Sequence, residues 1–124
     1  MSTKSKKILV VDDDPGVVKL VSELLKTRGF AVLTAVDGID CMVMVKKEKP
    51  DLIVLDIMMP EINGYDVCHN IKFNKELKEI PILLLTARDQ ELDPRIGEMM
   101  GIEYMHKPLD RELMFEKINQ LLGE

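Results

Sequence analysis

The sequence predicts an α/β protein built on a parallel, doubly wound β-sheet, and three observations support this fold class. Five short apolar runs alternate with five segments of helical spacing along the 124 residues. The runs are nearly continuous in apolar residues, which is typical of strands covered on both faces. Strands that alternate with helices form parallel βαβ units, whose right-handed crossovers place helices on both faces of one sheet.

The composition is that of one ordinary globular domain. Hydrophobic residues make up 46% of the chain and charged residues 31%, which is typical of a folded chain rather than a disordered one. We therefore expect a single domain over residues 1–124, with its core at about 7–122. The net charge of -5 argues against a basic nucleic-acid surface, and no apolar run approaches the roughly 18 residues of a membrane span.

The start of the chain and its two cysteines indicate a reducing compartment. The first apolar run is too short for a signal-peptide core, so we expect a cytoplasmic protein. Cys41 and Cys68 match neither a CxxC motif nor a zinc spacing. We expect both thiols to be small fillers of the hydrophobic core.

The first half of the chain contains three predicted strands, at residues 8–11, 31–35 and 52–55. Asp14-Pro15 predicts the start of the first helix, because aspartate caps helix N-termini and proline suits the first helical turn. Gly29 is the expected C-terminal stop of that helix. A second helix is predicted to begin at Asp37-Gly38 and to end near Lys49-Pro50.

The second half contains three predicted helices and two strands. A loop with Pro60 and Gly64 leads into a helix near residues 65–73. A strand at 80–85 precedes a helix that ends near Met100-Gly101, and a last strand covers 102–105. Asp110 is predicted to cap the final helix, whose apolar stripe is Leu113, Met114, Ile118, Leu121 and Leu122.

Chemically active side chains follow four of the five predicted strands. They are Asp12, Asp13 and Asp14 after the first strand, Asp56 at the third, Thr86 at the fourth and His106-Lys107-Pro108 at the fifth. The carboxyl ends of parallel strands share one edge of the sheet, where open α/β sheets bind ligands. Each residue alone is commonly a turn residue, and Asp14 is best explained as a helix cap. Their coincidence at one edge indicates a functional site.

Clustered carboxylates at this edge predict a bound cation. Two carboxylates about 4 Å apart repel each other by about 4 kcal/mol at an effective dielectric near 20. Oxygen ligands without Cys or His suit Mg²⁺. Lys107 would add a second positive charge, and Thr86 would add a hydroxyl donor. These groups suit a pocket for a phosphoryl group, with a carboxylate as the nucleophile.

These motifs together resemble the receiver domains of two-component response regulators. The matching segments are residues 8–15, 50–56, Met59-Pro60, Asn63-Gly64, Ile80-Pro81, 85–87, Tyr104 and Lys107-Pro108. The resemblance covers essentially the whole chain in the family's order and spacing. It implies a single (βα)5 flavodoxin-like domain with strand order 2-1-3-4-5. It also implies a protein that is no enzyme, beyond catalysing its own phosphorylation and dephosphorylation.

The resemblance implies a role for each matching residue. Asp56 resembles the phosphoacceptor. Asp12 and Asp13 resemble the acidic pair around Mg²⁺, with Asp13 the direct ligand, and Met58 would offer the metal its backbone carbonyl. The remaining three residues resemble the switch hydroxyl (Thr86), the lysine that pairs with the phosphoryl group (Lys107) and the aromatic switch (Tyr104).

Three positions, in two places, depart from the family's pattern. The family usually has Gly-Ala seven and six residues before the lysine, where this chain has Met100-Gly101. Either the turn into the last strand is one residue shorter, or Met100 replaces the glycine that ends the preceding helix. His106 stands where a small hydroxyl residue is common, and we expect it to be a solvent-facing neighbour of the site.

The function implied by the resemblance is that of a phosphoacceptor in a two-component or phosphorelay system. A sensor histidine kinase or histidine phosphotransfer protein would phosphorylate Asp56, and the changed surface would act on a downstream protein target or output domain. No direct contact with nucleic acid or membrane is expected. Two alternatives stay open: a whole single-domain regulator or an excised receiver, and a monomer or a weak phosphorylation-dependent homodimer.

Three other functions are compatible with a similar α/β fold. Phosphatases of the aspartyl-phosphate type carry a second aspartate two residues after the nucleophile, where this chain has Met58. A flavin-binding flavodoxin-like domain needs a hydroxyl- and glycine-rich phosphate loop, whereas the triple aspartate here repels phosphate. A pseudo-receiver, which binds its partner without phosphorylation, is the alternative that only an assay separates from a true receiver.

Overall fold

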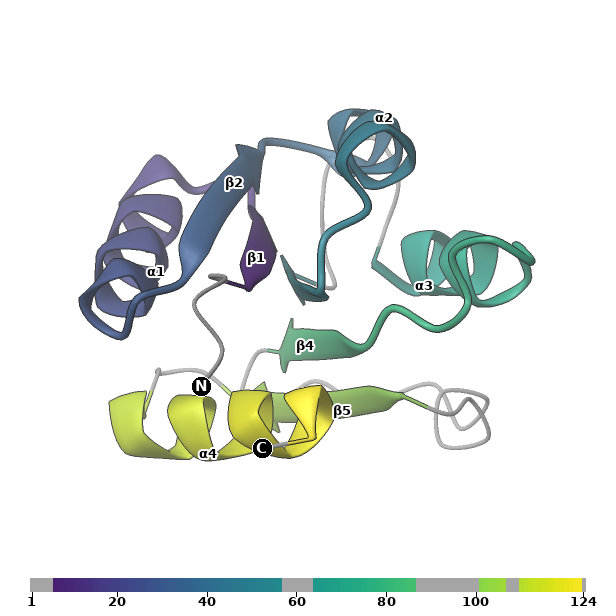
Figure 1. Cartoon of the computed structure of the whole chain (residues 1–124). Helices are drawn as coiled ribbons and strands as arrows, with labels where there is room; N and C mark the ends of the chain where they lie inside the picture. Colours follow the sequence, from purple (N-terminus) through teal and green to yellow (C-terminus); the bar gives the residue numbers. More distant parts are fainter. Residues whose placement is uncertain (1–5, 57–63, 87–100, 107–109, 124) are drawn as a thin grey trace.

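The computed structural model describes residues 6–56, 64–86, 101–106 and 110–123, and it shows a central β-sheet with helices on both faces (Figure 1). The sheet consists of β1 (Lys7–Val11), β2 (Ala31–Ala35), β3 (Leu52–Asp56), β4 (Ile82–Thr86) and β5 (Ile102–His106). All neighbouring strands pair in parallel, in the order β2-β1-β3-β4-β5. The predicted fold class and strand order are confirmed.

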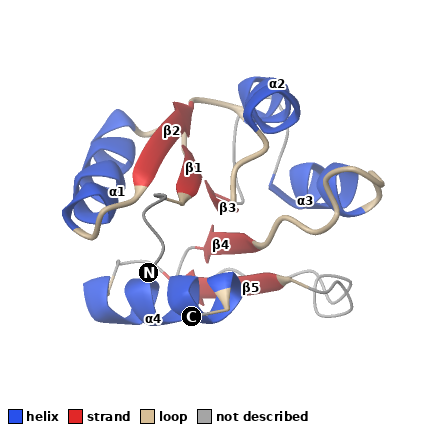
Figure 2. Cartoon of the chain, viewed as in Figure 1, coloured by secondary structure: helices blue, strands red, loops and turns tan. Residues whose placement is uncertain are grey.

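Two helices cover each face of the sheet in the described part of the chain (Figure 2). α1 (Pro15–Thr27) and α4 (Arg111–Leu122) pack on one face, and α2 (Gly38–Glu48) and α3 (Gly64–Lys72) pack on the other. The helix predicted to end near Met100 lies outside the described residues. Among the described helices, none combines the length and the apolar character that a membrane crossing requires.

Aspartate caps begin three of these helices: the caps at Asp14 and Asp110 were predicted, and Asp37 caps the helix that was predicted to begin at Asp37-Gly38. The Asp14 carboxylate accepts the Gly16 N–H at 2.9 Å, and Pro15 occupies the first helical turn. The carboxylates of Asp37 and Asp110 accept the N–H groups three residues later. Each cap pairs a backbone donor that the first helical turn leaves without an intrahelical partner.

Alternate residues of the strands build two separate hydrophobic cores. Leu9, Ile53 and Leu84 pack with α2 and α3, whereas Val10, Val54 and Leu83 pack with α1 and α4. This two-sided burial explains why the strands are almost continuous apolar runs.

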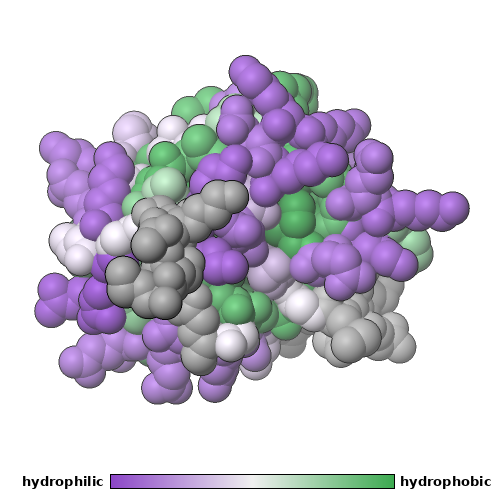
Figure 3. All heavy atoms as spheres, in the orientation of Figure 1, coloured by the Kyte–Doolittle hydropathy of each residue, from purple (hydrophilic) through white to green (hydrophobic). Residues whose placement is uncertain are grey.

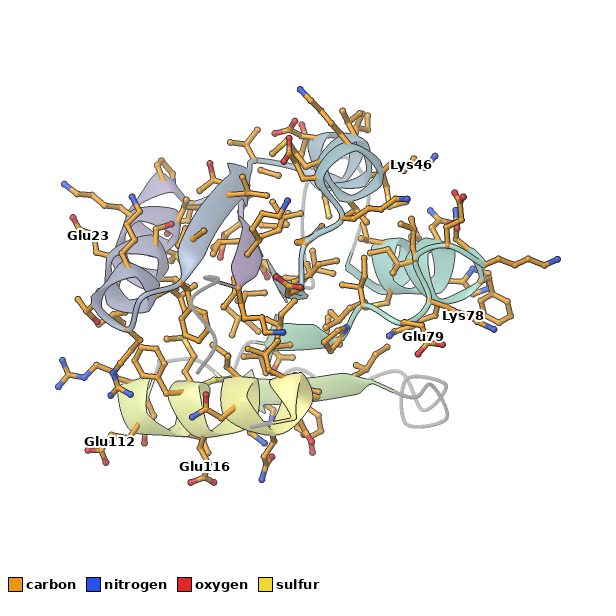
Figure 4. The ribbon with its side chains drawn as sticks, in the orientation of Figure 1. Glu23, Lys46, Lys78, Glu79, Glu112 and Glu116 are labelled. Carbon is orange, nitrogen blue, oxygen red and sulfur yellow. The ribbon has the colours of Figure 1, made fainter. Side chains whose placement is uncertain are left out.

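Hydrophilic side chains dominate the face shown in Figure 3. Figure 4 shows Glu112 and Glu116 pointing away from the sheet on the outer side of α4.

The fourth strand begins at Ile82, so the predicted start at residue 80 is wrong by two residues. The N–H of Ile80 donates to the Leu77 carbonyl in the preceding turn, and Pro81 has no N–H to donate. The β3, β4 and β5 strands each end one residue beyond the predicted apolar ranges, at Asp56, Thr86 and His106. Each of these strands therefore ends in a polar residue at the carboxyl edge of the sheet.

The turn into β5 depends on Gly101 and Lys72. Gly101 has a φ of +80°, in the left-handed region that favours glycine. A Cβ at this position would lie 2.9 Å from the Lys72 ammonium, which donates to the carbonyls of Ile80 at 2.8 Å and Lys78 at 3.1 Å. Partial burial lowers the pKa of this ammonium. The left-handed residue before β5 is thus Gly101, while Met100 lies outside the described residues.

A Gly101→Ala variant should lose more stability than Gly29→Ala. Gly29 also has a positive φ, of +86°, but a Cβ there would meet no atom within 4 Å. Backbone strain alone should cost Gly29→Ala about 1 kcal/mol. Gly101→Ala should cost about 1 kcal/mol more, because the added methyl displaces the Lys72 ammonium from its carbonyl partners. Urea unfolding measures both losses. Equal losses, or an extra loss that persists in a Lys72→Met background, would contradict the Lys72 contact.

The two cysteines are buried and unpaired, as predicted for core fillers. Cys41 on α2 and Cys68 on α3 are both fully buried in the core between these helices and the sheet. Burial raises the pKa of each thiol from 9.0 to about 12. Because the thiolate is the reactive form, both thiols should be chemically inert in the folded protein.

Thiol reagents should therefore label the folded protein slowly. At pH 8 we expect both cysteines to react with an aromatic disulfide reagent roughly a hundredfold or more slowly than in urea-unfolded protein. Cys41→Ala and Cys68→Ala variants assign the remaining signal to one thiol each. Rapid labelling of either thiol in folded protein would show that the thiol is accessible and that its pKa is not raised.

Candidate functional site

Three carboxylates meet at the carboxyl edge of the sheet. Asp12 and Asp13 follow β1, and Asp56 is the last residue of β3. The two strands pair in register, with Val11 opposite Leu55, so the following residues are neighbours. Ligand oxygens of the three side chains lie within 4.8 Å of one another. The structure thus brings together the three aspartates that the sequence predicted as a cation site.

The three aspartates differ in exposure and in hydrogen bonding. Asp12 is 1% exposed, Asp13 is exposed and Asp56 is half-buried. One Asp12 oxygen accepts the Asp14 N–H at 3.0 Å, which holds the turn between β1 and α1. Asp14 itself caps α1, as predicted. Of the three consecutive aspartates, Asp12 and Asp13 belong to the carboxylate cluster, whereas Asp14 caps the helix.

The donor set fits a hard divalent cation. Every side chain of the cluster offers carboxylate oxygen, and none offers a histidine nitrogen or a thiolate. Carboxylates this close together repel one another, and a dication removes that repulsion. Mg²⁺ binds through one or two carboxylates while keeping water or phosphate oxygens in its other positions. The exposed Asp13 leaves the cluster open to such further ligands.

A cavity of about 500 Å³ borders this cluster on the side of α1 and β2. Asp12 and Asp13 line one part of it, and Lys19, Ser22 and Thr34 line other parts. Of the two aspartates that line it, Asp12 is buried and Asp13 is exposed, so the cavity reaches the cluster at the Asp13 side chain.

Thr86 lies at the same edge, at the end of β4. The β4 strand pairs with β3 so that Leu85 is opposite Asp56, and Thr86 is the next residue along. The Thr86 side chain is only 1% exposed. Its Oγ1 lies 2.7 Å from Nδ1 of His106, its partner in the register of β4 and β5. This contact offsets the cost of burying the Thr86 hydroxyl away from water.

His106 is exposed, as predicted, but its contact with Thr86 was not predicted. The signal that could have identified it is positional, since residues 86 and 106 end neighbouring parallel strands. The same ring also contacts Tyr104, with the ring centroids 5.7 Å apart in an edge-to-face arrangement. Tyr104 is 42% exposed and lies on the same face of β5 as His106. Thr86, His106 and Tyr104 form a row of contacting side chains from the buried edge to the surface.

Several predicted site residues fall outside the described part of the chain. Met58 and Lys107, with Pro108, belong to segments on which the structure gives no geometry. Their assigned roles therefore stay predictions. The described site comprises the three aspartates, Thr86, His106 and Tyr104.

The chain matches the sequence profile of the response regulator receiver domain over residues 8–119. It is 40% identical over 119 residues to the alkaline phosphatase synthesis transcriptional regulatory protein PhoP of Bacillus subtilis, covering 95% of this chain and 49% of that protein. It is also 35% identical to the protein PilH of Pseudomonas aeruginosa, covering 94% of this chain and 98% of that protein. The chain thus spans about half the length of the Bacillus relative and nearly all of PilH.

Solved structures share the fold. The response regulator protein TrrA of Thermotoga maritima, solved in complex with Mg²⁺ and beryllofluoride, superimposes with a TM-score of 0.83 at 34% identity. The match covers 94% of this chain and 98% of that one.

Mg²⁺ should stabilise the folded protein through the carboxylate cluster. At a free concentration ten times the Kd, binding to the folded state alone adds about 1.4 kcal/mol to the free energy of unfolding. Thermal unfolding with and without Mg²⁺ measures this gain. Asp13→Asn should reduce it strongly, whereas Asp14→Asn should keep it, because Asp14 caps α1 and asparagine is also a good cap. An unchanged gain in Asp13→Asn would place the cation elsewhere.

Proposed function

Because the chain belongs to the receiver domains of two-component response regulators, we propose that it accepts a phosphoryl group on Asp56 from a phosphohistidine of a partner protein. The observation that carries this proposal is the position of Asp56. Its carboxylate ends the central strand β3, among the Asp12 and Asp13 carboxylates and beside the strand that ends in Thr86. Among the described residues, Asp56 is the carboxylate placed between the acidic pair and that hydroxyl.

The transfer converts one phosphoryl linkage into another. An Asp56 oxygen attacks phosphorus, the phosphorus–nitrogen bond of the phosphohistidine breaks, and the imidazole leaves with the bonding electron pair. Asp12 and Asp13, with Asp56 and the Met58 carbonyl, would hold Mg²⁺, which neutralises charge on the phosphoryl oxygens. We assign Lys107 to a second neutralising contact. The chain would be no enzyme beyond catalysing its own phosphorylation and the hydrolysis of the acyl phosphate.

The phosphoryl group would act as an electrostatic switch. It brings roughly -1.5 to -2 charges and strong acceptor oxygens to the edge of the sheet. The Thr86 hydroxyl, buried at that edge, is the side-chain hydroxyl that β4 contributes. Movement of Thr86 toward the phosphoryl group would shift the end of β4, and Tyr104 on β5 would follow. The protein would thereby favour a conformation that it already samples.

The partners follow from this scheme as proposals. A sensor histidine kinase or histidine phosphotransfer protein would supply the phosphoryl group, and a downstream protein or output domain would read the altered β5 surface. The half-length match to the Bacillus regulator fits a receiver attached to an output domain, and the full-length match to PilH fits a single-domain protein. A weak phosphorylation-dependent homodimer, a cytoplasmic location and a single domain over residues 1–124 also stay predictions.

Intact mass spectrometry after incubation with Mg²⁺ and acetyl phosphate tests the proposal. We expect the wild-type protein to gain the mass of one phosphoryl group, and Asp56→Asn to gain none. Asp51→Asn is the matched control, because Asp51 lies at the opposite end of β3, where its carboxylate accepts the Lys7 N–H. This variant should be modified like the wild type.

A wild-type protein that stays unmodified, although it binds Mg²⁺, would contradict the proposal. That result would favour a pseudo-receiver, which engages its partner without phosphorylation. Equal modification of wild type and Asp56→Asn would assign the acceptor to another residue.

A further inference from the structure

The Thr86 hydroxyl already has a hydrogen-bond partner within the described structure, and that partner is His106. The 2.7 Å separation of Oγ1 and Nδ1 is short for a bond between these atoms, and it joins register partners at the ends of β4 and β5. Thr86 is 1% exposed, so water cannot readily replace the imidazole as its partner. The position of the hydroxyl is therefore set by the neighbouring strand.

A threonine hydroxyl carries a single proton, and this proton can be donated to one acceptor at a time. When neutral imidazole carries its proton on Nε2, Nδ1 accepts the Thr86 proton. An acyl phosphate on Asp56 offers its oxygens as competing acceptors at the same edge. Recruitment of Thr86 to the phosphoryl group then requires the bond to His106 to break.

We propose that His106 is a positioning residue that holds the Thr86 hydroxyl in the conformation described here and competes with the phosphoryl group for it. This inference rests on the proposed function, since it concerns the same phosphoacceptor site. The imidazole acts as a latch: it stabilises the conformation in which Thr86 points to β5 and thereby lowers the population of the phosphorylated-like conformation.

The latch also connects the hydroxyl to the surface. The His106 ring contacts the Tyr104 ring edge-to-face, and Tyr104 is partly exposed on the same strand face. Release of Thr86 frees the imidazole to reorient, and the Tyr104 ring then loses its edge contact. Glu103, one of the alternate residues of β5, faces α4 instead and pairs there with Lys117 at 3.3 Å. Tyr104 and His106, the residues of the proposed switch, thus lie on one face of β5, and the ion pair between Glu103 and Lys117 lies on the other.

Beryllofluoride, with Mg²⁺ at saturation, is the probe for the phosphorylated-like conformation. We expect His106→Leu to bind it about two- to tenfold more tightly than the wild type, because one net hydrogen bond no longer opposes Thr86 recruitment. His106→Asn should bind it like the wild type, because its side-chain oxygen lies near the position of Nδ1 and can accept the Thr86 proton. In a Thr86→Ala background, His106→Leu should leave the affinity unchanged.

Weaker or unchanged binding by His106→Leu overturns the latch, as does an Asn variant that behaves like the Leu variant. A change that persists without the Thr86 hydroxyl also overturns it. Because His106 is exposed, both substitutions should fold, and urea unfolding of each variant verifies this. Calorimetric or NMR titration gives the dissociation constants.

A second measurement separates this inference from the proposed function. In the free protein at pH 8, the ¹⁵N shifts of the His106 ring should show a protonated Nε2 and an unprotonated, hydrogen-bonded Nδ1. Failure of the wild type to bind beryllofluoride or to accept a phosphoryl group overturns the proposed function, and with it the competition. A ring that carries its proton on Nδ1 overturns the latch alone, even when phosphorylation of Asp56 succeeds.

Discussion

The parallel register of the four strands β1, β3, β4 and β5 is the constraint on which the site depends. It aligns Val11 with Leu55, Asp56 with Leu85 and Thr86 with His106. Side chains at the ends of these strands therefore lie close together, although they are far apart in the sequence. A slip of one residue would turn the side chains of a strand to the opposite face. The register is held because both faces are buried against helices.

Burial of the apolar strand residues offsets the electrostatic repulsion within the carboxylate cluster. Two carboxylates about 4 Å apart repel by about 4 kcal/mol at an effective dielectric near 20. Full burial of one large aliphatic side chain contributes about 1.5–3 kcal/mol, and the strands bear many such side chains on both faces. The fold can therefore keep an unfavourable cluster at its edge, and a bound cation would recover part of that cost.

The sequence predicted the features that depend on residues close together in the chain. The caps at Asp14 and Asp110, the helix start at Asp37-Gly38 and the apolar strands are confirmed, because each follows from a few adjacent residues. The carboxylate cluster is also confirmed, since the rule for parallel strand ends needs only the order of elements. The contacts between Thr86 and His106 and between Lys72 and Gly101 were not predicted. They join side chains 20 and 29 positions apart, and only the register or turn geometry brings them together.

The departures from the family's pattern at positions 101 and 106 have different physical consequences. Gly101 shapes the turn into β5, where its missing side chain leaves room for the Lys72 ammonium. His106 ends the same strand, and its imidazole forms a hydrogen bond with the Thr86 hydroxyl. A small hydroxyl residue at position 106 would reach less far toward Thr86 than an imidazole and would offer Tyr104 no aromatic edge. The turn before β5 thus bears on the stability of the fold, whereas the end of the strand bears on the proposed control of Thr86.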